Sequence, residues 1–154
     1  MLYRFFILSA CVLALCISSF AAPNAATSTV PDKAYLQKLL DGWGTLDSSN
    51  MKPYYAQDDR LFFDIAPVKY NNWAEYQAGT TDLFKNYKSL KMTLGDDTQI
   101  HHDGNLVWAA STVKEDAMTA GGKHELGTFR WTILFQKMDG KWLVVHEHTS
   151  LSAQ

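Results

Sequence analysis

Cysteine is almost missing from this chain, because its two cysteines, Cys11 and Cys16, both lie within residues 1–21 of 154. Beyond residue 21 the sequence therefore offers no disulfide, no thiol nucleophile and no thiolate metal ligand. Long apolar runs are scarce too. The run from Phe5 to about Ile17 is shorter than the roughly 20 apolar residues that a membrane-spanning helix needs. Without disulfides, the fold must depend on its hydrophobic core.

Clusters of basic residues are also missing. Beyond residue 21 the chain has 13 basic and 16 acidic side chains, because Arg4 is the only charged residue of 1–21. A net charge of −3 without a basic patch argues against nucleic acid and anionic membrane as partners. The motifs G-x-S-x-G and glycine-rich phosphate loops are absent, so nothing in the sequence supports nucleophilic catalysis.

The N-terminal segment 1–21 is typical of a secretory signal peptide. Arg4 precedes the apolar run, and Ser19-Phe20-Ala21 has the small-x-small form of a cleavage site. An uncleaved membrane anchor is the alternative. We predict that residues 1–21 are removed, that 22–30 form a disordered lead-in, and that 31–152 form one periplasmic or secreted domain. No membrane contact is expected after cleavage.

The first half of this domain is predicted to be mainly helical. Pro31 and Asp32 suit the first turn of a helix, whose apolar stripe is Leu36, Leu39, Leu40, Trp43 and Leu46. Residues 48–50 can cap a second, short helix at 51–57, and 60–65 is predicted to be a strand. Asn71 or Asn72 can cap a third helix, with one face formed by Trp73, Tyr76, Thr80, Leu83, Phe84 and Tyr87.

The second half is predicted to be a long antiparallel meander. Its four strands are expected at about 88–101, 104–117, 124–138 and 141–150, separated by turns that contain glycine. Asp139-Gly140 lies between two apolar strands and predicts a tight hairpin. The fold class is therefore α+β, with about 4–5 antiparallel strands, a short early strand, and N-terminal helices packed on one sheet face.

Apolar residues occur on both faces of the predicted sheet. Phe129, Trp131, Ile133 and Phe135 share one face, whereas Thr132 and Leu134 lie on the other; in the last strand Leu143 and Val145 oppose Trp142 and Val144. Because the helices can cover one face only, we predict that a second copy of the chain covers the other. On this interpretation Trp142 and His146 belong to the interface of a homodimer.

The order of these elements resembles a known family. A helix, a short helix, "YYAQDDRLFFD", a further helix and a meander ending in "DGKWLVVHEHTS" are similar to the nuclear transport factor 2-like superfamily, and within it to the SnoaL-like and ketosteroid-isomerase-like branch. The ending also resembles the oligomerisation domain of the calmodulin-dependent multifunctional kinase. The resemblance implies a cone-shaped sheet wrapped around a helix, with a pocket at the open end. Because members include isomerases, cyclases, epoxide hydrolases, binders and assembly domains, it does not choose a function.

Asp64 is the first candidate for chemistry. The resemblance aligns "DDRLFFD" with the segment that supplies the general base of ketosteroid isomerases, and the preceding apolar residues could desolvate the carboxyl and raise its pKa. Alternatively, Asp64 ends a strand by bonding to nearby backbone amides. The oxyanion donors of that enzyme are missing, since Leu40 and Thr132 or Ile133 stand where they would be expected. Each lost donor would cost roughly 3–4 kcal/mol.

Glu147 is the second candidate, within the run His146-Glu147-His148. On a strand, Glu147 points to one face and both histidines to the other. By resemblance, the face with Glu147 and Thr149 would line the pocket with Trp131 and Phe135. A two-residue hairpin turn would pair Glu147 with Thr132, and a three-residue turn would pair it with Trp131. The other histidines, His101, His102 and His124, show no ligand spacing, so neither a metal nor another cofactor is predicted.

Two hypotheses of function remain. In the first, the domain is an exported, dimeric, non-catalytic protein that binds a small apolar or amphipathic molecule in an aromatic pocket. In the second, it is an isomerase, cyclase or dehydratase that uses Asp64 or Glu147 as a general base. Both place Asp64, Tyr76, Trp131 and Glu147 in the pocket.

Overall fold

The computed structural model describes residues 29–65 and 67–152, which form a strongly curved sheet around its helices. The elements in order are α1 (Lys33–Trp43), the 3-10 helix η1 (Ser48–Tyr54), β1 (Phe62–Phe63), α2 (Trp73–Phe84), β2 (Tyr87–Leu94), β3 (Gln99–Asp103), β4 (Leu106–Thr119), β5 (His124–Met138) and β6 (Lys141–Ser150). The strand order is β1-β6-β5-β4-β2, with β3 also paired to β4. All pairs are antiparallel except β1 with β6. The predicted α+β fold class is confirmed.

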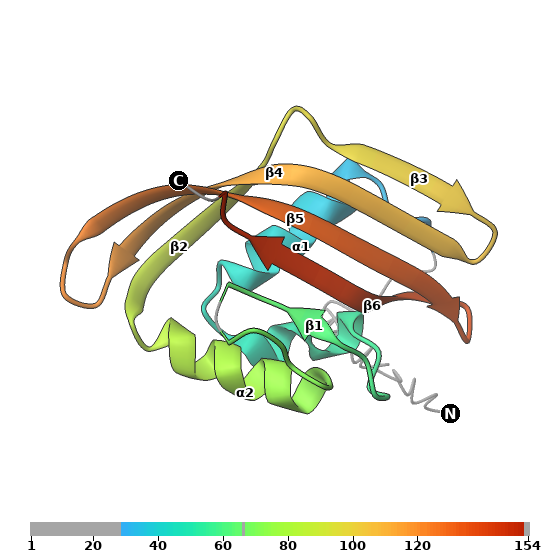
Figure 1. The fold of residues 1–154 in the computed structure, drawn as a ribbon, viewed down its shortest axis with the longest axis horizontal. Helices are drawn as coiled ribbons and strands as arrows, with labels where there is room; N and C mark the ends of the chain where they lie inside the picture. Colours follow the sequence, from blue (N-terminus) through green and yellow to red (C-terminus); the bar gives the residue numbers. More distant parts are fainter. Residues whose placement is uncertain (1–28, 66, 153–154) are drawn as a thin grey trace, which may run out of the picture.

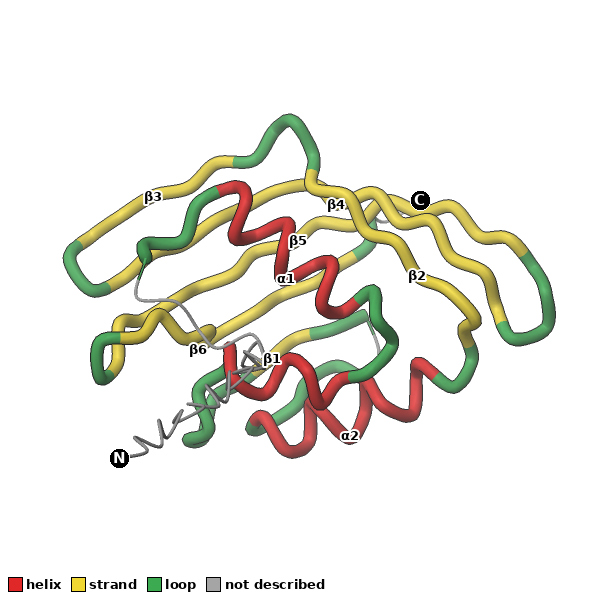
Figure 2. Tube along the Cα trace, turned by 180° about the vertical axis from the view of Figure 1, so that it is seen from behind, coloured by secondary structure: helices red, strands yellow, loops and turns green. Residues whose placement is uncertain are grey.

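The sheet arches over the helices (Figure 1). Seen from behind, α1 lies across the concave face of the sheet, and α2 lies beside β1 at its margin (Figure 2). Within the described residues, no helix is long and apolar enough to cross a membrane.

Both long helices begin at side-chain caps. Asp32 Oδ1 accepts a hydrogen bond from the Tyr35 amide at 2.8 Å, and Asn72 Oδ1 accepts one from the Glu75 amide at 2.9 Å. Each cap satisfies an amide that the helix leaves unpaired. Of the two asparagines proposed as caps, Asn72 is therefore the right one. Helix α1 ends at Trp43, so Leu46, with a positive φ of 59°, lies beyond it.

Two predicted elements differ from the structure near the helices. The short helix spans Ser48–Tyr54 rather than 51–57, because the Asp47 carboxylate caps it by accepting from the Ser49 amide at 3.0 Å. In α2, Leu83 does not join the buried face, since its side chain is 41% exposed. Gly79 of the same helix lets Tyr70 pack against the helix backbone, because a Cβ at that position would overlap the tyrosine ring.

The strand predicted at 88–101 is in fact two strands. Both β2 and β3 pair with β4, one after the other along the same edge. Between them Asp97 Oδ1 accepts hydrogen bonds from the Thr112 amide at 3.1 Å and from its hydroxyl at 3.0 Å, while the Gly95 amide donates to the Thr112 carbonyl at 2.8 Å. A side chain thus replaces a strand neighbour here and divides the strand.

The last hairpin has a register that neither predicted turn produces. The turn has two residues, Asp139-Gly140, both with positive φ, as the Asp-Gly signal predicts. However, a β-bulge at Val145 shifts the pairing, so that Glu147 pairs with Ile133 rather than with Thr132 or Trp131. The bulge keeps Trp142 and Val144 on the same inner face as Glu147 and Thr149.

The assignment of Trp142 to a dimer interface was therefore wrong. Its side chain is 3% exposed and belongs to the hydrophobic core. Strict alternation would have sent either Trp142 or Glu147 outward, and the bulge allows both to face inward. His146 and His148 lie on the outer face, where both rings meet the Phe63 ring edge-on.

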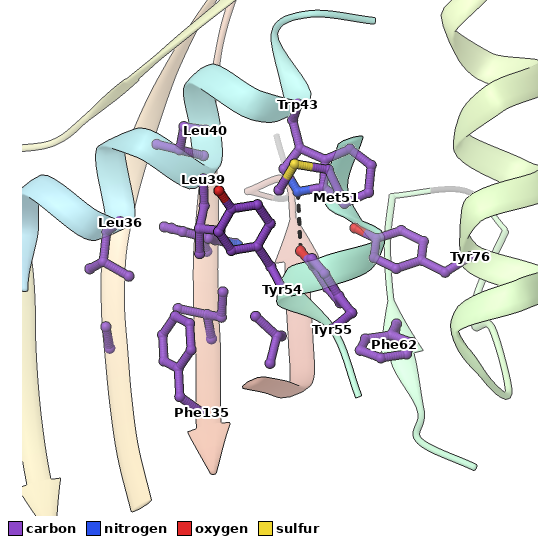
Figure 3. Close-up of a cluster of buried hydrophobic side chains, with 14 of the residues drawn as sticks. Leu36, Leu39, Leu40, Trp43, Met51, Tyr54, Tyr55, Phe62, Tyr76 and Phe135 are labelled. Atoms are coloured by element: carbon purple, nitrogen blue, oxygen red, sulfur yellow. Dashed lines mark hydrogen bonds between the residues drawn. The ribbon is translucent and has the colours of Figure 1, made fainter. Parts of the chain in front are cut away.

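The core is rich in aromatic side chains from every layer. Figure 3 shows residues of α1, η1, β1, α2 and β5 converging, among them Leu36, Tyr54, Phe62, Tyr76 and Phe135. Phe62 stacks on Tyr76 with ring centroids 5.2 Å apart. Each such side chain contributes on the order of 2–3 kcal/mol through burial. This burial stabilises a domain that has no disulfide.

Candidate functional site

A cavity of about 320 Å³ opens between α1, α2 and the inner face of the sheet. Its wall includes six aromatic side chains, Trp43, Tyr76, Phe84, Tyr87, Phe129 and Trp131. Its lining also includes the exposed apolar residues Ile65, Leu83 and Leu151, which are 50%, 41% and 56% exposed. Exposed apolar groups gathered around an aromatic cavity are typical of a site that receives an apolar ligand surface.

Glu147 lies against this cavity and is almost completely buried, with 4% of its surface exposed. Its two carboxylate oxygens have different donors: the Trp131 Nε1–H donates to Oε1 at 2.6 Å, and the Tyr55 hydroxyl donates to Oε2 in a short hydrogen bond. The Trp43 Nε1–H in turn donates to the Tyr55 hydroxyl oxygen at 3.1 Å (Figure 3). This chain of donors holds the carboxyl group in one orientation.

Burial raises the pKa of Glu147 from its usual 4.5 to about 7. Loss of water disfavours the charged form most strongly, the hydrogen bonds from Tyr55 and Trp131 oppose that effect, and the nearby charge of Asp64 adds to it. A carboxyl group with a pKa near 7 exchanges a proton readily at neutral pH. Glu147 therefore has the ionisation that a general acid or base requires.

Of the carboxyl groups in the described residues, Asp64 and Glu115 are the other two that line the cavity. Burial raises the pKa of Asp64, and the hydrogen bond that it accepts from the Ile65 amide at 2.7 Å lowers it. Burial also raises the pKa of Glu115, as do the charges of Glu125 and Asp64. Asp64 thus accepts a hydrogen bond from a backbone amide and also lines the cavity.

Tyr76 supplies a hydroxyl group to the same cavity. The ring extends from α2 toward Trp43 and Tyr55 (Figure 3), and the residue is 4% exposed. Within the part of the chain that the structure describes, no hydrogen bond is made to this hydroxyl. A polar group without a partner is unusual in a residue that is almost completely buried, and here the cavity is the space open to a partner.

The histidines lie away from this cavity. His146 Nδ1 is 2.8 Å from the Leu61 carbonyl oxygen on the outer face, and His101 stacks on Trp108 at 4.1 Å. Among residues 29–65 and 67–152 no group of three histidine or acidic side chains is placed to hold a metal ion.

The structure brings together all four residues that the sequence placed in a pocket: Asp64, Tyr76, Trp131 and Glu147. Sequence reasoning missed Tyr55, which is one of the two donors to Glu147, and it also missed Glu115. Tyr55 follows a short helix without a periodic pattern, so no spacing marked it. Glu115 could have been found, because it lies two residues from both Val113 and Ala117 on β4 and so shares their inward face.

Comparison with known proteins agrees with this architecture. Residues 33–154 match the family model of the SnoaL-like domain, and no curated protein matches the chain. A nuclear transport factor 2-like superfamily protein from Salmonella enterica serovar Typhimurium is similar with a TM-score of 0.70 and 19% identity, over 79% of this chain and 92% of that protein.

Two further solved structures are similar over most of the chain. A candidate calcium/calmodulin dependent protein kinase II association domain from Xanthomonas campestris has a TM-score of 0.67 and 17% identity, over 87% of this chain and 99% of that one. A candidate dehydratase of the nuclear transport factor 2-like family from Streptomyces avermitilis has a TM-score of 0.67 and 10% identity, over 79% of this chain and 95% of that one. Identities this low show a shared fold only.

Proposed function

Since the chain belongs to the SnoaL-like domain family, we propose that it binds a small apolar or amphipathic molecule in the cavity beside Glu147. The observation that carries this proposal is the pairing of an aromatic wall with the exposed apolar residues Ile65, Leu83 and Leu151. Exposing these side chains to water is unfavourable, and a ligand that covers them recovers about 25 cal/mol for each Å² removed from water.

A neutral fluorescent probe, N-phenyl-1-naphthylamine, tests this proposal. We expect the probe to bind and Leu83→Asp to weaken its binding about tenfold or more, because a charge at the cavity opposes an apolar ligand. Val68→Asp is the matched control, since Val68 is 84% exposed and does not line the cavity. Equal affinities of the two variants would contradict the proposal.

Asp64→Ala separates the two roles of that carboxyl group. If Asp64 mainly serves the cavity, the variant keeps its stability while binding of the probe changes. If Asp64 mainly bonds to the Ile65 amide, the variant loses about 1 kcal/mol of stability and binds normally. Urea unfolding and probe titration on the same variant distinguish these outcomes.

Acid–base catalysis is the second candidate function, favoured by the pKa of about 7 for Glu147. Glu147 would remove a proton from a carbonyl compound, and the unpartnered Tyr76 hydroxyl would donate to the developing oxyanion. The isomerase positions do not supply such donors, since Leu40 is apolar and Ile133 is fully buried in the core. Turnover that rises with pH through about 7 and is lost in both Glu147→Gln and Tyr76→Phe would support catalysis.

A homodimer through the outer face of β5 and β6 completes the proposal. Leu134, Leu143 and Phe63 lie on this face and are only partly covered within one chain. A stable interface of ordinary size buries about 1,600 Å². Light scattering should give twice the mass of one chain, and Leu134→Asp should give a monomer; a monomeric wild-type protein at high concentration would exclude the dimer.

Export is proposed for the segment 1–21, which lies outside the described residues. The support is the charged, apolar and small-residue pattern of that segment. N-terminal sequencing of the exported protein should begin near Ala22, in the periplasm or the medium. A first residue of Met1 would instead favour the membrane anchor.

A further inference from the structure

The cavity is acidic as well as aromatic. Three carboxyl groups line it, Asp64, Glu115 and Glu147, and within the described part of the chain no lysine, arginine or histidine does. The charge of Asp64 raises the pKa of both other carboxyl groups and of the Tyr76 hydroxyl, so these groups interact electrostatically. Like charges in a partly dry site repel one another, and no cationic side chain of residues 29–65 or 67–152 lines the cavity to relieve the repulsion.

The aromatic wall reinforces this polarity. The faces of tryptophan and tyrosine rings carry partial negative charge and attract cations, most strongly where water is excluded. Trp43, Trp131 and Tyr76 are each at most 5% exposed. Carboxylates and aromatic faces thus both favour a positively charged ligand, whereas both would repel an anion.

The Tyr76 hydroxyl is the independent sign that a polar ligand atom belongs in the cavity. Tyr76 as a residue is 4% exposed, its ring lies beside Trp43, and its hydroxyl has no partner among the described residues. A hydroxyl oxygen accepts hydrogen bonds, so an N–H donor of a ligand can satisfy it. Glu147 has one donor on each oxygen and keeps acceptor capacity for another.

We propose that the ligand of this cavity is an organic cation: an amphipathic molecule whose protonated amine lies among Asp64, Glu115, Glu147 and Tyr76, while its apolar part contacts the aromatic wall. This inference rests on the proposed binding function and names the chemical class of the ligand. The amine occupies the acidic part of the cavity, and the apolar part extends toward Ile65, Leu83 and Leu151 at 50%, 41% and 56% exposure.

Three probes of nearly equal size and different charge test the proposal by calorimetric titration at pH 7.5. They are 2-phenylethylamine, which is a cation, 2-phenylethanol, which is neutral, and 3-phenylpropanoate, which is an anion. We expect the amine to bind about tenfold more tightly than the alcohol, and the anion not to bind at about 10 mM. An alcohol that binds as tightly as the amine overturns the cation proposal and leaves the binding function intact. Absence of binding by all three overturns both.

Two variants show whether the cavity acids are responsible. Glu115→Gln should weaken binding of 2-phenylethylamine about fivefold or more, and leave 2-phenylethanol unchanged. Asp116→Asn is the matched control, because Asp116 is the next residue of β4, points outward and pairs with His124 at 2.8 Å. Equal losses in the two variants would mean that general surface charge, not the cavity, attracts the amine. Asp64→Asn repeats the test if Glu115→Gln fails to fold.

Discussion

The two halves of β6 bury different kinds of side chain on the same face. Before the bulge, Trp142 and Val144 complete a filled end of the core, together with Phe135 and Val107, and all four are at most 3% exposed. After the bulge, Glu147 and Thr149 face the cavity. One end of the molecule is closed by apolar packing, and the other holds an ionisable group under a space of about 320 Å³. The packed end of the core and the candidate site are thus separated along one strand.

The bulge at Val145 makes this separation possible. Without the extra residue, alternation from Trp142 and Val144 would carry His146 and His148 inward and Glu147 outward. Bulges redirect side chains, and they are common beside functional sites. The contrast between the filled end and the cavity end can be tested with matched pairs of substitutions.

The largest effect is expected from truncating phenylalanine at each end of β5. Phe135→Ala, at the filled end, should cost about 3–5 kcal/mol, because the side chain is fully buried and leaves a void. Phe129→Ala should lower the free energy of unfolding by clearly less than Phe135→Ala does, because Phe129 already borders the cavity. Urea unfolding of both variants measures the difference. Equal losses would mean that the cavity end is packed as tightly as the filled end.

The next effect is a dependence of stability on pH through Glu147. Its pKa is about 7 in the folded protein and takes the usual value of 4.5 in the unfolded chain, so folding favours the protonated form. The contribution of Glu147 to the free energy of unfolding is therefore fully present at low pH. It is lost as pH rises from about 4.5 to 7, a change of about 3 kcal/mol. Relative to wild type, Glu147→Gln should gain stability as pH rises through this window. Parallel pH profiles of the two proteins would contradict the shifted pKa.

Removing Tyr55, one of the two donors to Glu147, should have a smaller effect. Tyr55→Phe leaves one carboxylate oxygen of Glu147 and the Trp43 Nε1–H without their partner, which costs about 1–3 kcal/mol. It should also raise the pKa of Glu147 further, since this hydrogen bond lowers it. Tyr54→Phe is the control: Tyr54 is buried nearby, and no hydrogen bond joins its hydroxyl to another described residue. Urea unfolding at pH 8 measures the stability of both variants. Equal losses of stability would mean that the hydrogen bond from Tyr55 to Glu147 does not stabilise the fold.

The smallest effect is expected from Trp142→Phe. The Trp142 Nε1–H is buried without a hydrogen-bond partner in the described structure, so losing it removes an unfavourable group while the smaller ring leaves a small void. These effects oppose each other, and the net change should stay within about 1 kcal/mol. Trp131→Phe should cost more, because the Trp131 Nε1–H donates to Glu147 at 2.6 Å. The reverse order of the two variants would contradict this account.

Much of the fold could be predicted because it depends on local patterns. Helical spacing from Leu36 to Trp43, an asparagine cap at 71 or 72 and the Asp139-Gly140 turn are read from neighbours in the chain, and the structure selects Asn72. The division of the strand at 88–101 could not be predicted, because it depends on the hydrogen bond between Asp97 and Thr112, which is 15 residues away. The register of β6 was missed for a similar reason, since a bulge depends on how two long strands curve together.

The amino-acid sequence by itself determined the α+β class and the family resemblance, because these follow from periodicity and motif order. The resemblance, rather than any local pattern, implied that Asp64, Tyr76, Trp131 and Glu147 share a pocket. Only the tertiary structure decided that Glu147 is buried beside Tyr55, 92 residues earlier, and that Trp142 is in the core rather than at an interface. The pKa of Glu147 likewise arises from burial and from donors on other elements. These properties depend on which distant residues exclude water from a group, and no local pattern contains that information.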